Sequence, residues 1–286
     1  MDERTTAGVL LGYDGSLPAG AAIEVAARLL PDTQGQVTYI WTPPFASEAL
    51  RRRLWHGVGG VNEFVVAIER EGEAEARRIA AMGVALAAAH GWKAQPLIRR
   101  SYGAEGLQLD EVAEETGADL IVVGSRGLGG AQAVLSSVSD MVVHYARSPV
   151  LVVPHPLLEA ERAVLDIGPV VVGWDGSPAA EFALAAVTRL FPGRAVLPVF
   201  ADGGEEPAGP TPPGLVRLRR DGGRLESGRA NAAALADHAR TEDAAVIAVG
   251  SRGRSALREI LLGSSAMATL HHAHRPVLVV PFRAPR

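Results

Sequence analysis

The stretch GSRGRSALREILLGSS, residues 250–265, follows the apolar run AAVIAV and precedes a segment that ends in RPVLVV. Its first two glycines lie three residues apart, nine residues follow, and the stretch closes on Gly-Ser-Ser. Glycine lets a backbone turn sharply and come close to a neighbouring group. We therefore interpret the stretch as a glycine-rich loop between a buried strand and a helix.

The chain carries a second copy of this arrangement. GSRGLGGAQAVLSSVS begins at Gly124 after the run DLIVV, and SPVLVV follows it. Two further pairs of segments match and keep the same order along the chain. They are 7–20 with 168–180, and 135–154 with 262–281. Self-similarity in a constant order indicates a tandem duplication.

Each half alternates short β-branched runs with Ala- and Leu-rich stretches at helical spacing, which predicts a parallel sheet covered by helices on both faces. The second copy is shorter, because Asp14 and Gly124 lie 110 residues apart but Asp175 and Gly250 only 75. The long helical stretch 63–90 has no counterpart there. We predict a first domain, a linker and a second domain that lacks the helix after its second strand. Their bounds are 1–154, 155–168 and 169–286.

Composition bounds the class of protein. Hydrophobic residues make up 48% of the chain, which is typical of a globular protein with a core. The net charge is −4, whereas nucleic-acid binders are usually basic. It contains no cysteine, which excludes thiol chemistry. No apolar run reaches the roughly 20 residues of a membrane helix, and the N-terminus has no apolar signal core. We expect a cytoplasmic protein without nucleic-acid or membrane partners.

The glycine loops follow strands of a parallel sheet, where ligands bind beyond the carboxyl ends. Ser264 and Ser265 open a helix, whose free N–H groups and dipole attract anions. A phosphate chain lying along 250–253 fits this chemistry, and Asp175 is placed to accept a hydrogen bond from a ribose hydroxyl. The alternative is that the glycines only form turns and the serines only cap helices. There is neither a P-loop motif nor a GxGxxG that opens the first helix.

The spacing G-x2-G-x9-G-[ST] after the fourth strand, an Asp after the first strand and a terminal PVLVV together resemble the universal stress protein family. The resemblance covers nearly the whole chain, once in each half. It implies an α/β fold of two tandem, open, Rossmann-like parallel sheets with strand order 3-2-1-4-5. It also implies pairing through the last strands, which makes an internal pseudo-dimer, and it leaves a homodimer open.

The resemblance further implies ATP, with Mg²⁺ as an optional companion, at the carboxyl ends of the central strands. The first half is one residue short between Gly127 and Ser136, so the intact spacing predicts the second half as the functional site. For Arg252 a phosphate contact and a solvent-facing position both stay open. The implied nucleotide contacts are Asp175, Val199, Gly250, Arg252, Gly253, Gly263, Ser264 and Ser265 in the second half, and Asp14, Ile40, Gly124, Gly127 and Ser137 in the first.

The leading hypothesis is an ATP-binding stress-response regulator with little or no turnover, and its protein partner is not encoded in any motif. One alternative is a slow ATPase or phosphotransferase, although no catalytic base or metal-binding carboxylate cluster stands at motif spacing. A third is a structural dimerisation module with empty sites. The histidines of HHAH, 271–274, are set aside as a metal site, because only one of the three recurs in the first half.

Overall fold

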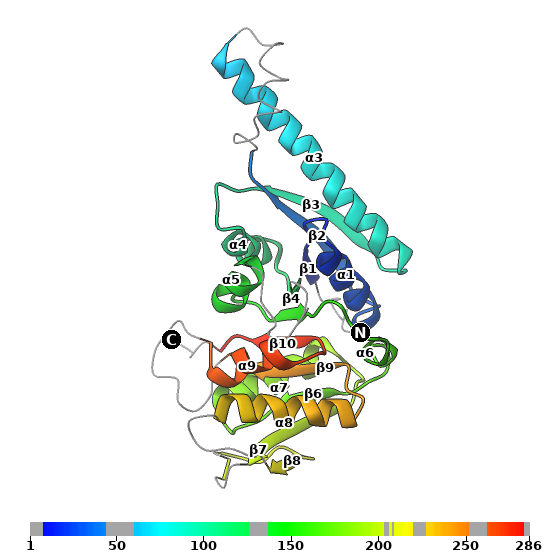
Figure 1. Ribbon diagram of the computed structural model, residues 1–286, viewed down its shortest axis with the longest axis vertical. Helices are drawn as coiled ribbons and strands as arrows, with labels where there is room; N and C mark the ends of the chain where they lie inside the picture. Colours follow the sequence, from blue (N-terminus) through cyan, green and yellow to red (C-terminus); the bar gives the residue numbers. More distant parts are fainter. Residues whose placement is uncertain are drawn as a thin grey trace, which may run out of the picture.

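The computed structural model describes residues 8–43, 60–125, 137–202, 206–207, 209–219, 227–251 and 262–282. Ten strands form one sheet in the order β3-β2-β1-β4-β5-β10-β9-β6-β7-β8 (Figure 1). The strands of the first half are β1 Gly8–Gly12, β2 Gln34–Trp41, β3 Ala94–Arg100, β4 Leu120–Gly124 and β5 Val150–Val153. Those of the second half are β6 Val170–Gly173, β7 Val196–Asp202, β8 Val216–Arg219, β9 Val246–Gly250 and β10 Val277–Val280.

Neighbouring strands are parallel within each half, and the two halves meet at one antiparallel pair. In that pair, β5 and β10 place Leu151 opposite Leu278, and both side chains are fully buried. The order within each half is 3-2-1-4-5. The predicted α/β fold with an internal pseudo-dimer is therefore confirmed.

Helices cover both faces of this sheet. The helices α1 (Leu17–Leu29), α3 (Val61–Ala89) and α7 (Pro178–Leu190) pack on one face, and α4 (Glu105–Thr116), α5 (Ser137–Tyr145), α8 (Ser227–Thr241) and α9 (Ser264–His272) pack on the other. Each face has a hydrophobic cluster that includes residues of both halves, so the two halves share their cores. In the described ranges, no helix combines the length and apolar character needed to cross a membrane.

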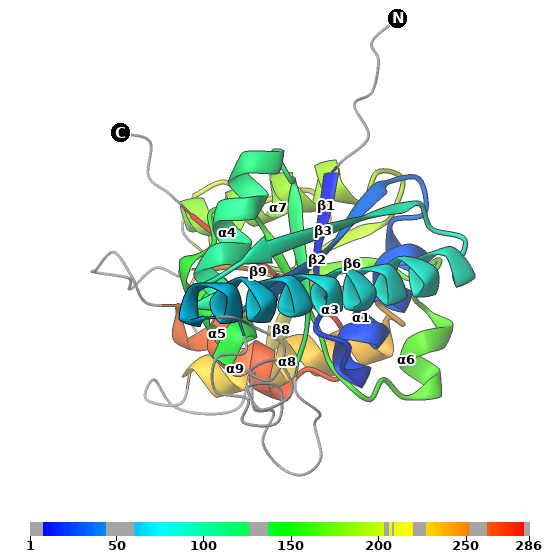
Figure 2. The same cartoon turned by 90° about the horizontal axis from the view of Figure 1, so that it is seen from above.

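The two halves differ most after their second strands. The helix α3 runs for 29 residues and lies across β2 and β3 (Figure 2). The described residues between β7 and β8 form no helix, and β8 pairs directly with β7. Val216 and Leu218 of β8 join the α8–α9 cluster, whereas Arg217 and Arg219 are exposed on the opposite face. Arginines suit that face because, among the described residues, no helix like α3 covers it.

The segment between β5 and β6 contains a short helix, α6 (Glu159–Ala163), which is tied to both halves. Arg162 binds both carboxylate oxygens of Glu24 in α1, at 2.8 and 2.9 Å. Arg28 of α1 makes a two-pronged contact with Asp166. From the second half, Arg194 donates to two backbone carbonyls of the segment, at 2.7 and 2.9 Å. These contacts fix the segment against the body, although the domain bounds at 154 and 169 stay a proposal.

Candidate functional site

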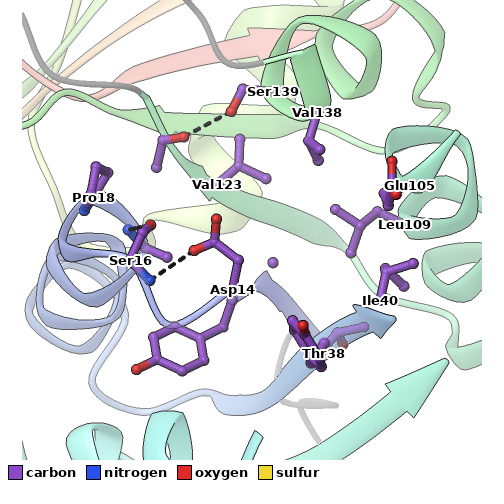
Figure 3. Close-up of a pocket in the computed structure, with 15 residues that line it drawn as sticks. Asp14, Ser16, Pro18, Thr38, Ile40, Glu105, Leu109, Val123, Val138 and Ser139 are labelled. Atoms are coloured by element: carbon purple, nitrogen blue, oxygen red, sulfur yellow. Dashed lines mark hydrogen bonds between the residues drawn. The ribbon is translucent and has the colours of Figure 1, made fainter. Parts of the chain in front are cut away.

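A cavity of about 320 Å³ opens at the carboxyl ends of β1, β2 and β4, in the first half (Figure 3). This volume lies within the range of about 300–1,000 Å³ that is usual for small-molecule sites. The edge of the sheet is the one at which parallel sheets bind ligands. The first turns of three helices, α1, α4 and α5, also contribute to the wall, through Pro18, Glu105 and Ser139.

The turn after β1 fixes the carboxylate of Asp14. Gly15 has a φ of +82°, which lets the chain turn back so that the N–H of Ser16 donates to Asp14 Oδ1, at 2.9 Å. Ser16 Oγ in turn accepts from the N–H of Ala19 and caps α1, at 3.3 Å. The other oxygen of Asp14 faces the cavity (Figure 3). The carboxylate is thus held in one orientation with an acceptor directed at the site.

The second half repeats this turn with the same geometry. The N–H of Ser177 donates to Asp175 Oδ1 at 2.9 Å, and Ser177 Oγ accepts from the N–H of Ala180 at 3.3 Å. The sequence repeat GYDGS/GWDGS is therefore a repeat of backbone and side-chain geometry.

The glycines that end β4 and β9 have a packing reason that does not require a ligand. A Cβ atom at Gly124 would lie 2.4 Å from the carbonyl oxygen of Pro18, in the first turn of α1. A Cβ atom at Gly250 would lie 2.7 Å from the carbonyl oxygen of Ala179, in the first turn of α7. Gly124 also lines the cavity, so it permits helix packing at the very wall of the site.

The predicted helix start at Ser264 is confirmed, with Gly263 as the N-cap residue of α9. The N–H of Gly263 donates to the carbonyl of Ser251, at 2.8 Å. Ser265 Oγ accepts a hydrogen bond from Asn231 Nδ2 of α8, at 3.2 Å. In the first half α5 begins at Ser137, the position that matches Ser264.

The predicted nucleotide contacts Ile40 and Val199 do not occupy equivalent places in the two halves. Gly12 of β1 pairs with Thr38, and its counterpart Gly173 pairs with Val199. Val199 therefore matches Thr38, and the counterpart of Ile40 is Ala201, two residues further along. Ile40 lines the cavity, whereas the Val199 side chain is in the core with 1% exposed. A shift of two residues leaves the same side chains on each face of a strand, so the sequence pattern does not reveal it.

Of the predicted contacts in the first half, Asp14, Ile40 and Gly124 meet at the cavity. Arg252, Gly253 and Gly127 lie outside the described residues, as does the side chain of Ser137. Sequence reasoning missed several other lining residues. They are Thr38, Tyr39, Glu105, Leu109, Val138 and Ser139. No motif in the sequence marks these residues, and only the folded sheet brings the first residue of α4 to the same edge as Asp14.

The described wall of the cavity is acidic. It includes the carboxylates of Asp14 and Glu105 and no lysine, arginine or histidine. Burial, and then the charges of Asp14 and Glu75, raise the pKa of Tyr39, so this phenol is neutral at physiological pH. Within the described part of the chain, no cluster of three or more potential metal ligands occurs. This wall suits a ligand that presents hydrogen-bond donors.

Comparison with known proteins shows to which family the chain belongs. The model of the universal stress protein family matches residues 8–154 and 225–281. A universal stress protein of Mycolicibacterium smegmatis is 30% identical over 308 residues, which cover 98% of this chain and 99% of the relative. One of Thermus aquaticus is 34% identical over 162 residues, which cover 51% of this chain and 96% of the relative.

A solved universal stress protein structure from Archaeoglobus fulgidus matches with a TM-score of 0.63 at 17% identity, over 97% of this chain and 99% of that one. The chain therefore belongs to the universal stress protein family, as a tandem member.

Proposed function

We propose that this protein is a stress-response regulator that binds an adenine nucleotide in the cavity of its first half. The observation that carries the proposal is the Asp14 carboxylate, which the Ser16 N–H orients toward a cavity of about 320 Å³. A ribose hydroxyl is a donor of the kind that such a carboxylate accepts. The position at the carboxyl ends of β1, β2 and β4 is where the family resemblance implies a nucleotide.

The residues present fit the nucleoside part of ATP or AMP. Asp14 would hold the ribose, while Leu109, Val123 and Val138 offer an apolar wall for the base. These side chains would exclude water from the base and so strengthen the hydrogen bonds made at its edge. Bound nucleotide supplies binding free energy rather than a reaction in this proposal, so occupancy biases the shape presented to a protein partner.

The proposal takes the first half because its described residues enclose the cavity, and the second half, which the intact spacing favours, is the alternative site. The Asp14 turn has the same geometry as the Asp175 turn, so matched substitutions in the two halves separate the sites. The comparison does not depend on the loop lengths that differ between the halves.

The test is calorimetric titration of the full chain with ATP and AMP, together with native mass spectrometry of the freshly purified protein. We expect Asp14→Ala to weaken binding by about tenfold, because a hydrogen bond to a charged group contributes about 1.5–3 kcal/mol. The matched variant Asp175→Ala should leave this binding unchanged. The reverse pattern would place the site in the second half, and failure of the wild type to bind either nucleotide would overturn the proposed function.

A further inference from the structure

Glu105 is the second carboxylate of the cavity, and it lies across the site from Asp14. It is the first residue of α4 and is half-buried, on the side of the cavity where Leu109 and Ile40 lie (Figure 3). No hydrogen bond or ion pair joins it to another residue in the described part of the chain, whereas Asp14 is held by the Ser16 N–H. One end of the cavity thus carries an oriented acceptor and the other a carboxylate with its acceptor capacity unused.

The helix dipole explains why a glutamate stands at the start of α4, but it does not explain why the side chain points into the cavity. A negative charge in the first turn of α4 is stabilised by the helix dipole. Any exposed orientation would supply this benefit, yet the side chain lines a partly apolar cavity. When a bound ligand displaces water from this carboxylate, the loss of hydration is costly unless the ligand supplies a hydrogen-bond donor. A ligand that carries a donor group at this end of the cavity would offset that loss.

We propose that Glu105 sets the base specificity of the site by accepting a hydrogen bond from the exocyclic amine of adenine. The inference rests on the proposed nucleotide function. A purine with oxygen at the same ring position, such as hypoxanthine or guanine, would place an acceptor against this carboxylate. A buried polar group that is left facing an acceptor rejects the analogue strongly. Asp14 and Glu105 then recognise the two ends of one adenosine.

The second half lacks this carboxylate at the equivalent place. The helices α4 and α8 can be aligned by their ends, because Ala118 N donates to Ala113 O just as Ala244 N donates to Ala239 O. Counting back from Ala113 and Ala239, Glu105 matches Asn231. The amide of Asn231 is neutral and donates to Ser265 Oγ of α9. The proposed recognition of the base by a carboxylate therefore applies to the first half alone.

The experiment compares ATP with inosine triphosphate, which carries an oxygen in place of the exocyclic amine. We expect the wild-type chain to bind ATP at least about tenfold more tightly, as expected for one charge-assisted hydrogen bond. Glu105→Gln should weaken ATP binding by about tenfold and bring the ratio of the two affinities close to one, since an amide can also donate to the oxygen. The control is Glu111→Gln, an exposed position on the same helix that contacts Gln108.

The outcomes separate the two proposals. If wild type binds ATP and Glu105→Gln keeps the full preference for ATP, the role of Glu105 is wrong and the proposed function stands. If wild type binds neither nucleotide, the proposed function fails and this inference fails with it. If Glu105→Gln does not fold by circular dichroism, Glu105→Asp takes its place. That variant keeps the charge but shortens the reach, and it should lose affinity for ATP while inosine triphosphate binding changes little.

Discussion

Gly124 is required for the packing of α1 on the sheet and also lies at the candidate site. Its missing side chain lets the first turn of α1 lie directly on the end of β4, and the same turn carries the Ser16 cap that orients Asp14. The family-like spacing predicted glycine here for the approach of a ligand. The structure adds that the protein's own backbone occupies the space a Cβ atom would need.

We expect Gly124→Ala to destabilise the protein by about 1–3 kcal/mol, the usual cost of overpacking a close contact. The new Cβ atom would meet the Pro18 carbonyl oxygen at 2.4 Å, and backbone cannot move aside as a side chain can. The control is Gly8→Ala in β1, where the nearest atoms are 3.7 Å away. Urea unfolding measures both variants, and equal midpoints would show that α1 shifts freely on the sheet.

Asp14 could be predicted from the sequence because a local turn, repeated in GYDGS and GWDGS, creates its geometry. Glu105 could not be predicted in this way. Two consecutive residues, Gly103 and Ala104, have positive φ values of 129° and 59° and carry the chain from β3 into α4. Alanine seldom adopts this conformation, so no residue preference signals the turn. Only the folded sheet shows that the first residue of α4 reaches the cavity.

At the scale of elements, continuous apolar runs were sufficient to predict the central strands, because LIVV and both copies of VLVV are fully buried. It was not sufficient for the register of β7, where a shift of two residues preserves the alternation of faces. The segment of α6 was expected only as a linker. Its role depends on arginines that find partners distant in sequence, such as Arg162 with Glu24 and Arg28 with Asp166.

The pair of Arg28 with Asp166 predicts a dependence of stability on pH. The hydrogen bond and charge of Arg28 hold the pKa of Asp166 below its ordinary value of 3.8, although burial acts in the opposite direction. A carboxylate with a lowered folded-state pKa stabilises the fold above the unfolded value, and the contribution is lost as pH falls through the lowered pKa. Since 56% of the Asp166 side chain is exposed, solvent screening limits the pair to about 0.2–1 kcal/mol.

The measurement is a double-mutant cycle with Arg28→Gln and Asp166→Asn, followed by urea unfolding at low salt. We expect a favourable coupling energy at neutral pH that is lost as the pH falls through the lowered pKa of Asp166, because the carboxylate then becomes protonated. A coupling energy that stays constant across this range would mean that the two side chains interact through packing rather than charge.

For the whole molecule, the antiparallel pair of β5 and β10 turns two similar halves into one sheet whose edges are β3 and β8. Both edge strands carry features that discourage pairing with another chain. Pro96 lies within β3, and Arg217 and Arg219 alternate along β8. The apolar strands β5 and β10 would be a liability at an edge, and their place at the centre removes it.

The last prediction is that cutting the chain between the halves does not separate them. Ile167 is 86% exposed and adjoins β6, so a specific protease site inserted there should be accessible. We expect the cut protein to migrate as one particle on a sizing column, because β5 and β10 stay paired and Arg189 of α7 still binds Asp119 of the first half. In the same cut chain, Leu278→Asp would bury a charge at the centre of the junction and should release the halves or unfold them. Separation of the unsubstituted halves without denaturant would show that the 155–168 segment, rather than the shared sheet, holds the molecule together.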